Sequence, residues 1–214
     1  MVDGLGGDID GDWFHMNAIY YDGSDNSLIV SGQRQGVVKV DWNNNLKWII
    51  SPHKGWDKAG RDGTGPDTKP FLLTAIDASG NAYDSLVQHG YQNYTDFDWS
   101  WGQHAPLILP NGNILLFDNG RIRNFQQGTY SRAVEYEIDE QNMTIEQKWS
   151  YGESRGGDTY AEIISDVDYL AETGNVLFAP GIKLGGSYSK IVEVTYPGGL
   201  EVFEGTMKYK NQRS

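Results

Sequence analysis

The sequence has no cysteine, few basic side chains and no long apolar run. Without cysteine, the chain has no disulfide scaffold, no thiolate zinc site and no cysteine nucleophile. It carries 17 Lys and Arg against 29 Asp and Glu, for a net charge of −12. Nucleic acid and anionic membranes both require concentrated positive charge, so we expect neither as a partner. No run approaches the roughly 18 apolar residues of a membrane helix. Met1-Val2-Asp3-Gly4 lack the basic and apolar regions of a signal peptide, and we expect none in this chain.

The 214 residues contain many short apolar runs, which are separated by turn-forming residues. The run Leu46-Lys47-Trp48-Ile49-Ile50 is rich in β-branched and aromatic residues and follows the turn signal Asn43-Asn44-Asn45. No stretch shows a sustained apolar period of 3.6 residues with caps at both ends. The sequence therefore predicts an all-β fold, and its length fits a single domain over residues 1–214.

The predicted strands recur in sets of four. The third strands of the first two sets resemble each other as Val38-Lys39-Val40-Asp41 and Tyr136-Glu137-Ile138-Asp139. A four-stranded antiparallel unit that repeats every 40–55 residues or so is typical of a β-propeller blade, although a meander or a sandwich is the alternative. The predicted strands are 17–21, 28–30, 37–40 and 46–50, then 106–109, 114–117, 133–138 and 145–149, then 162–165, 176–178, 191–194 and 200–203.

These sets predict three blades, at residues 15–52, 104–152 and 160–206, with an insertion at 53–103. Propellers close with about four to eight blades, and three blades leave open strand edges. Either the insertion supplies further strands, or the chain is part of a longer protein, or two copies assemble. We expect a functional insertion rather than a blade, because residues 54–69 are rich in Gly, Asp and Lys.

Two of the four histidines are candidates for chemistry. His15 and His104 each precede the first strand of a predicted blade, and that strand lines the central channel of a propeller. Two imidazoles in one cavity suit acid–base work or anion binding. The alternative is that each histidine ties its preceding loop to the blade.

An arginine-bearing loop and an aromatic segment are further candidates. Arg121-Ile122-Arg123 follows a predicted strand, and the planar guanidinium fork suits tetrahedral oxyanions, although a surface arginine on a turn is an equal alternative. Trp99 and Trp101 precede His104 and either stack on an aryl substrate or pack between blades. Residues 8–12 alternate carboxylates but lack the later ligands of a calcium loop, so we expect a solvated acidic loop and no metal site.

Several motifs, in order along nearly the whole chain, resemble the bacterial arylsulfate sulfotransferases. The family-like segments are Asp12-Trp13-Phe14-His15-Met16-Asn17, Gln33-Arg34-Gln35-Gly36-Val37-Val38-Lys39-Val40-Asp41, Pro52-His53-Lys54-Gly55-Trp56, Thr95-Asp96-Phe97-Asp98-Trp99-Ser100-Trp101-Gly102-Gln103-His104, Phe117-Asp118-Asn119-Gly120 and Ser131-Arg132-Ala133-Val134-Glu135-Tyr136-Glu137-Ile138-Asp139.

The resemblance implies a six-bladed propeller that moves a sulfuryl group from an aryl sulfate to a phenol through a sulfated histidine. It implies no cofactor, neither a nucleotide-type sulfate donor nor a metal. His15 and His104 match two active-site histidines, and Arg123, ahead of Arg121, matches the sulfate-binding arginine. Trp99, Trp101 and Asn17 are the candidate substrate-binding residues. The family's nucleophilic histidine is expected around residues 178–184, where this chain has Lys183 and no histidine.

The resulting prediction is a sulfotransferase-like chain covering about three of six blades, in which His15 or His104 takes the nucleophile's role. Two chains that pair as a homodimer would complete a ring. Typical family members are longer and exported, which implies a periplasmic location. The alternative function is a non-catalytic propeller module that binds an anionic or aromatic ligand or another protein.

Overall fold

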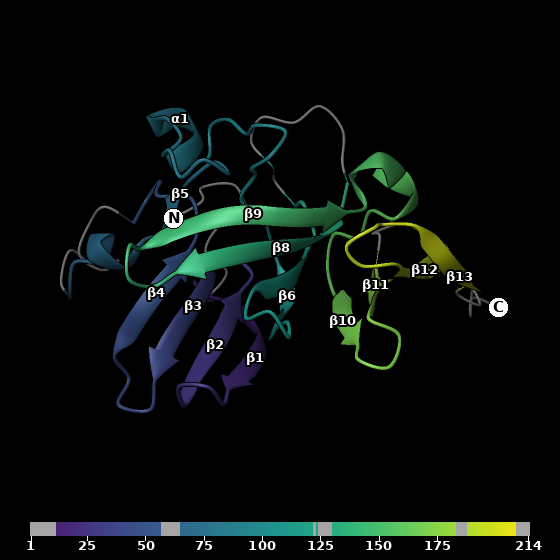
Figure 1. The fold of residues 1–214 in the computed structure, drawn as a ribbon, viewed down its shortest axis with the longest axis horizontal. Helices are drawn as coiled ribbons and strands as arrows, with labels where there is room; N and C mark the ends of the chain where they lie inside the picture. The colour runs from purple at the N-terminus through teal and green to yellow at the C-terminus, as the bar shows by residue number, and fades with distance from the viewer. Residues whose placement is uncertain (1–11, 57–64, 122, 124–129, 183–187, 209–214) are drawn as a thin grey trace.

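The computed structural model describes residues 12–56, 65–121, 123, 130–182 and 188–208. It contains three sheets of four antiparallel strands that follow one another along the chain, and the second sheet has one further short strand that pairs in parallel at its edge (Figure 1). The first sheet has the order β1 (Met16–Asp22), β2 (Ser27–Gly32), β3 (Gly36–Asp41) and β4 (Leu46–Ile50). The prediction of an all-β fold with four-stranded antiparallel blades is confirmed.

The second sheet contains β6 (His104–Ile108), β7 (Ile114–Asp118), β8 (Arg132–Asp139) and β9 (Thr144–Tyr151). Its third strand ends as that of the first sheet does, at an aspartate that accepts backbone N–H bonds from the turn. Asp41 accepts from Asn43 and Asn45, and Asp139 accepts from Gln141 and Asn142. These side chains substitute for backbone acceptors and fix both hairpins, which explains why the two segments are similar in sequence.

The third sheet consists of β10 (Asp166–Leu170), β11 (Asn175–Ala179), β12 (Tyr188–Val194) and β13 (Glu201–Lys208). Its first strand was predicted at residues 162–165, and that prediction is wrong. The strand lies at Asp166–Leu170, where buried Val167 alternates with exposed Asp166 and Asp168. The two carboxylates point to the solvent side of the strand and hide its apolar alternation in the sequence.

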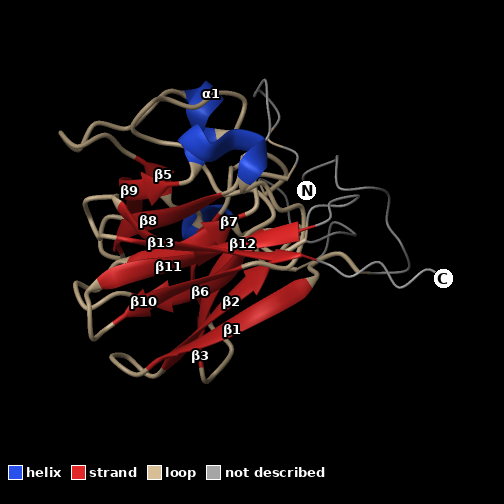
Figure 2. Cartoon of the chain, turned by 90° about the vertical axis from the view of Figure 1, so that its right-hand side faces the viewer, coloured by secondary structure: helices blue, strands red, loops and turns tan. Residues whose placement is uncertain are grey.

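The first strands of the three sheets are neighbours. β1 lies against β6, and β10 lies against β6 and β7. In a second view the strands of the three sheets form a stack, with α1 (Ser85–Gln88) above them (Figure 2). In each sheet the first strand begins beside the end of the second strand. The loops that precede β1, β6 and β10 therefore lie at the same end of their sheets as the loops that follow β2, β7 and β11.

The middle sheet is buried on both faces. Along β7, Ile114 and Leu116 pack into a core shared with the first sheet, while Leu115 and Phe117 pack into a core shared with the third. Phe117 stacks on Phe178 with 4.9 Å between ring centroids. Since alternate side chains of a strand point to opposite faces, a continuous apolar run is required where both faces meet a neighbouring sheet.

The described residues between 53 and 103 cover the outer seam between the first two sheets. They include the short helices η1 (Lys69–Phe71) and α1, and β5 (Thr74–Ala75), which pairs in parallel with β9. Leu72 bridges to Ile49 of β4, so consecutive residues of this segment contact the outermost strands of both sheets. The same segment supplies a large apolar share of the core, namely Leu73, Ala75, Val87, Phe97, Trp99 and Trp101.

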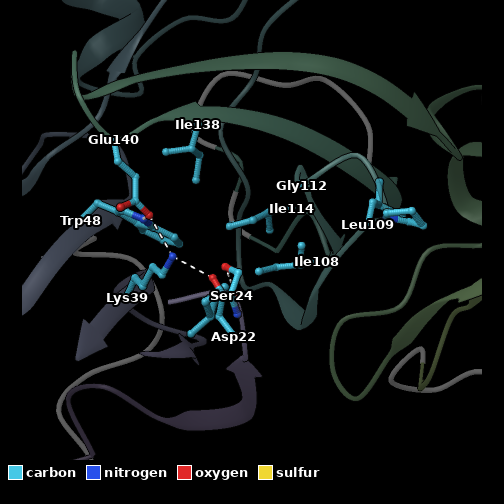
Figure 3. Close-up of a pocket in the computed structure, with 12 residues that line it drawn as sticks. Asp22, Ser24, Lys39, Trp48, Ile108, Leu109, Gly112, Ile114, Ile138 and Glu140 are labelled. Atoms are coloured by element: carbon cyan, nitrogen blue, oxygen red, sulfur yellow. Dashed lines mark hydrogen bonds and ion pairs between the residues drawn. The ribbon is translucent and has the colours of Figure 1, made fainter. Parts of the chain in front are cut away.

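A cavity of about 400 Å³ lies between the first two sheets, near the β1–β2 turn (Figure 3). Its charged wall is Lys39, whose Nζ lies 2.8 Å from Asp22 and 2.9 Å from Glu140. Glu140 also accepts from Trp48 Nε1 at 3.0 Å. The contacts of Glu140 with Lys39 and Trp48 cross the seam, and they join the two sheets at the wall of the cavity.

No helix among the described residues is long and apolar enough to span a membrane.

On β13 the exposed side chains include Val202, Phe203 and Met207, and Leu200 beside them is exposed as well. The pairing of two chains into one ring stays a prediction.

Replacing Trp99 tests whether the segment 53–103 belongs to the core. Trp99 is 1 % exposed, packs edge-on against Phe97 at 5.0 Å and donates its indole N–H to Val87. We expect Trp99→Ala to lower the free energy of unfolding by about 3–5 kcal/mol, measured by urea denaturation with circular dichroism. Leu86→Ala, at an exposed position of α1, should change it by less than about 0.5 kcal/mol. Equal effects of the two variants would contradict the assignment.

Candidate functional site

The structure brings His15 and His104 to the same end of two neighbouring strands. His15 directly precedes β1, and His104 is the first residue of β6. The charge of His15 reaches His104 and contributes to lowering its pKa, after the larger effect of burial. The two imidazoles therefore lie close enough to interact electrostatically, and their joint role in one site stays a prediction.

The two histidines do not occupy equivalent backbone positions. His15 has a φ of 53°, and the matching left-handed residues near the starts of β6 and β10 are Ala105 and Ile164, at 50° and 53°. His104 thus stands one residue earlier than His15 in the repeat. As a result, the His15 side chain is 44 % exposed, while His104 is 9 % exposed.

His15 is paired with a carboxylate. Its Nδ1 lies 2.5 Å from Asp12 Oδ2, and this hydrogen bond lowers the pKa of Asp12. Arg34 Nη2 lies 3.6 Å from the same oxygen. Asp12 thereby places an imidazole and a guanidinium side by side, in a position to act on one negatively charged group.

Arg34 and Arg121 are the arginines at this site, and sequence reasoning did not select Arg34. Both line a shallow cleft together with Gly102 and Gln103, directly before His104. A Cβ on Gly102 would lie 3.3 Å from Cβ of Arg121, which shows how closely this arginine packs on the loop. Arg34 follows β2, which ends where β1 begins, so its place in the hairpin after His15 is the signal that identifies it.

Asn17, predicted to bind substrate, joins the start of β1 to the segment before β6. Its Nδ2 donates to the carbonyl of Gln103 at 2.8 Å. Its Oδ1 has no hydrogen-bond partner among the described groups, which is uncommon for a buried acceptor, and it has almost no solvent-exposed surface in this geometry. Substrate binding by Asn17 stays a prediction.

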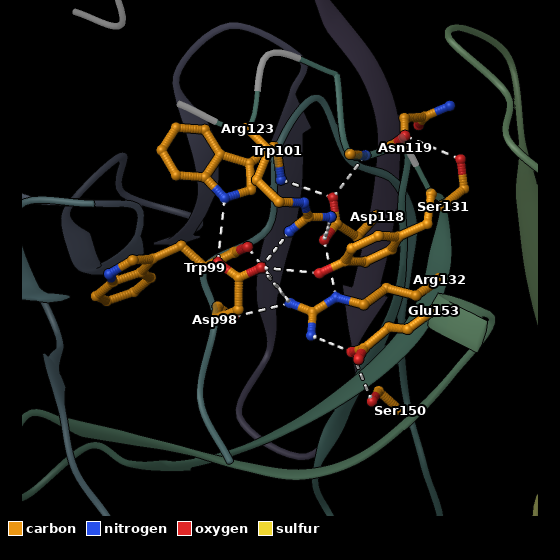
Figure 4. A network of polar contacts seen from close by, with 12 residues as sticks. Asp98, Trp99, Trp101, Asp118, Asn119, Arg123, Ser131, Arg132, Ser150 and Glu153 are labelled. Carbon is orange, nitrogen blue, oxygen red and sulfur yellow. Dashed lines mark hydrogen bonds and ion pairs between the residues drawn. The ribbon is translucent and has the colours of Figure 1, made fainter. Parts of the chain in front are cut away.

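Arg123, predicted to bind sulfate, is buried among carboxylates (Figure 4). Its guanidinium pairs with Asp98 and, at 2.9 Å, with Asp118, and it lies 4.3 Å from the ring centroid of Tyr130. Arg132 donates to Asp118 at 2.9 Å and completes a network of two arginines and two aspartates. In this geometry the Arg123 guanidinium is engaged by two carboxylates, and sulfate binding by Arg123 stays a prediction.

The two aspartates of this network respond differently to burial. Burial by itself would raise the pKa of Asp118, but the charges of Arg123 and Arg132 outweigh it and hold the pKa below its usual range. For Asp98 burial is the larger effect, and it raises the pKa despite the same two arginines. Asp118 also accepts backbone N–H bonds from Trp101 and Gly120, which favour its charged form.

Trp99 and Trp101 are core residues. They are 1 % and 4 % exposed, and their indole N–H groups donate to Val87 O and Asp98 Oδ1. Both rings pack in the apolar core. Trp101 also lines the cleft with Arg34 and Arg121, and substrate binding by the two tryptophans stays a prediction. Lys183, near the expected nucleophile position, lies outside the described residues.

No group of three or more His, Asp or Glu side chains that could hold a metal ion occurs among the residues that the structure describes. The polar groups around the two histidines include two imidazoles, the guanidiniums of Arg34 and Arg121, and the carboxylates of Asp12 and Asp166. Guanidiniums suit the binding of an anion, and imidazoles suit proton transfer and nucleophilic attack.

Comparison with known proteins identifies the family. The sequence model of the family described as Arylsulfotransferase (ASST) matches residues 2–214. The chain belongs to the arylsulfotransferase family. The resemblance drawn from the motifs is therefore confirmed.

Two curated relatives of this chain are both named arylsulfate sulfotransferase AssT. The protein from Escherichia coli O6:H1 is 38 % identical over 174 residues, which cover 79 % of this chain and 27 % of that protein. The one from Lelliottia amnigena is 36 % identical over 188 residues, covering 85 % and 30 %. The chain thus spans about three tenths of the length of these relatives.

One solved structure with a similar backbone is the Kuenenia stuttgartiensis hydrazine synthase, and the superposed region covers 97 % of this chain and 53 % of the hydrazine synthase chain. Its TM-score is 0.44 at 13 % sequence identity, a likeness too slight to carry an argument.

Removing the charge of Asp118 tests the buried network of this arylsulfotransferase chain. We expect Asp118→Asn to lower the free energy of unfolding by about 3–5 kcal/mol, because Arg123 and Arg132 would lose a shared buried counter-charge. The measurement is urea denaturation at neutral pH. Lys148→Met removes a half-exposed pair with Glu146 and should cost at most about 1 kcal/mol. A loss at Asp118 no larger than that at Lys148 would contradict the role of the network.

Proposed function

We propose that this chain carries the sulfuryl-transfer centre of an arylsulfate sulfotransferase, with His104 as the nucleophile. The observation that carries the proposal is the environment of His104. Its Nδ1 is engaged by two oxygen acceptors, and burial lowers its pKa, so the ring is neutral near pH 7. A neutral imidazole held by one nitrogen has a lone pair available at the other.

In the first half-reaction, Nε2 of His104 attacks the sulfur of an aryl sulfate. A sulfur–nitrogen bond forms, the bond between sulfur and the aryl oxygen breaks, and the electron pair leaves with the phenolate, which takes up a proton. Negative charge stays on the peripheral sulfuryl oxygens, as it does in phosphoryl transfer. Arg34 and Arg121, which line a cleft with Gly102 and Gln103 directly before His104 in the chain, would stabilise this charge.

In the second half-reaction a phenol takes the sulfuryl group. His15 accepts the phenol proton as the oxygen attacks sulfur, and the electron pair of the sulfur–nitrogen bond returns to Nε2 of His104. His15 suits proton transfer because its Nδ1 is oriented by Asp12, as a base is oriented by a third group in hydrolase triads.

These assignments divide the work between the two histidines according to their surroundings. His104 is buried and neutral, which favours nucleophilic attack. His15 is half-exposed beside a carboxylate, which favours proton exchange. A periplasmic location, implied for typical family members by the resemblance, is part of this proposal.

An assay of phenol release from an aryl sulfate tests the proposal. We expect His104→Gln to reduce release to the level without protein, and His15→Gln to slow transfer to the acceptor by about 10²- to 10⁴-fold. His89→Gln, a matched change at the exposed end of α1, should leave the rates unchanged. Release that persists in His104→Gln would contradict the assignment. No release by the unaltered chain, with retained binding of the aryl sulfate, would favour the non-catalytic binding module.

The pH dependence of the first half-reaction gives a second readout of the same assignment. Attack requires neutral His104, whose pKa lies below the ordinary 6.5. The acid limb of the rate should therefore reach half of its plateau value below pH 6.5, because the neutral fraction of His104 is halved at its pKa. A half-maximal rate at pH 6.5 or above would contradict a buried nucleophile with a lowered pKa.

A further inference from the structure

The hydrogen bonds around His104 determine which of its nitrogens carries the proton. Nδ1 lies 2.8 Å from Oδ1 of Asn119 and 3.2 Å from the carbonyl oxygen of Gly102. Both oxygens only accept, so Nδ1 must donate. In the neutral ring, Nε2 is then the unprotonated nitrogen.

This argument requires that Asn119 presents its oxygen to His104 and not its nitrogen. Nδ2 of Asn119 lies 2.8 Å from the carbonyl oxygen of Ala161 and 3.0 Å from Oγ of Ser165. The Ala161 carbonyl cannot donate, so the NH2 end of the amide must face it. Contacts on the far side of Asn119 therefore fix the orientation of its near side.

Asn119 has no freedom to turn away. It is fully buried, and its backbone carbonyl accepts a 2.9 Å hydrogen bond from Oγ of Ser131. The same hydroxyl oxygen accepts from the backbone N–H of Ala161 at 2.9 Å. Ser131 thus connects the turn after β7 to the segment before β10, and the amide is clamped between the second and third sheets.

We propose that Asn119, oriented by Ala161 and Ser165, is the positioning residue that keeps His104 in the Nδ1–H tautomer with Nε2 free. The segment that leads into the third sheet thereby acts on a histidine of the second sheet without touching substrate. The catalytic consequence rests on the proposed function, whereas the tautomer itself does not. The charged groups that also face His104 are His15 and Asp166.

Nitrogen NMR of the protein labelled with ¹⁵N-histidine tests the tautomer directly, and His104→Gln assigns the signals. At neutral pH we expect His104 to be neutral, with a protonated Nδ1 and an unprotonated Nε2. A neutral ring protonated at Nε2, or a doubly protonated ring, would overturn the proposal. This measurement uses the unaltered chain and needs no turnover, so it stands even if the sulfotransferase assay fails.

Variants of Asn119 then test its role. Asn119→Leu removes the acceptor, and we expect a mixture of tautomers and about 10²-fold slower phenol release. Ser165→Ala removes one of two acceptors of the amide and should change the release rate far less. Asn111→Leu, the same substitution in the β6–β7 turn at the far end of the strands, is the matched control and should leave the tautomer unchanged. An unchanged tautomer in a folded Asn119→Leu protein would overturn the proposal.

Asn119→Asp separates positioning from a structural role. The carboxylate keeps an acceptor for Nδ1 but loses the donor to the Ala161 carbonyl. Its negative charge favours protonated His104, which raises the pKa of His104. The acid limb of the pH–rate profile should therefore move to higher pH, while Nδ1 stays protonated. A profile with lower rates but an unmoved limb would indicate a structural role and contradict the proposal.

Discussion

The paired burial of Asp98 and Asp118 with Arg123 and Arg132 is the constraint on which the site depends. Four charges in the interior are tolerated only if each is neutralised and hydrogen-bonded. Here Asp118, at the end of β7, receives both arginines and the backbone N–H groups of Trp101 and Gly120. Its neighbour in the chain is Asn119, the partner of His104. The network therefore fixes the turn from which the histidine is oriented.

The arrangement of sheets explains why the site forms where it does. β1, β6 and β10 lie next to one another and begin at one end, so the loops of three sheets converge there. The first sheet contributes His15 and Arg34, and the second contributes His104 and Asn119. The segment before the third sheet contributes Ala161 and Ser165, which hold the Asn119 amide. Residues of the first two sheets and of the segment before the third thus lie around the His104 imidazole or hold its partner Asn119.

Much of the fold could be predicted from the sequence, because strands and turns are local. Strands in the first two sheets were placed to within a few residues, since Asp41 and Asp139 mark equivalent turns. The first strand of the third sheet was misplaced, because its acidic residues conceal the alternation. The histidines were found from their places before strands. Arg123 was preferred to Arg121 as the sulfate-binding residue because a sequence does not show that Asp98, 25 residues earlier, folds onto Arg123. Nor does it show that the tryptophans fill a core.

The central claim is that His104, held by the buried end of the second sheet, receives the sulfuryl group. The most direct measurement is to incubate the chain with an aryl sulfate and no acceptor, quench it under alkaline conditions and map the modified peptide by mass spectrometry. The account predicts one sulfuryl group, located on His104 and lost again when a phenol is added. A sulfuryl group on His15 or on a lysine, or release of phenol with His104 unmodified, would contradict it.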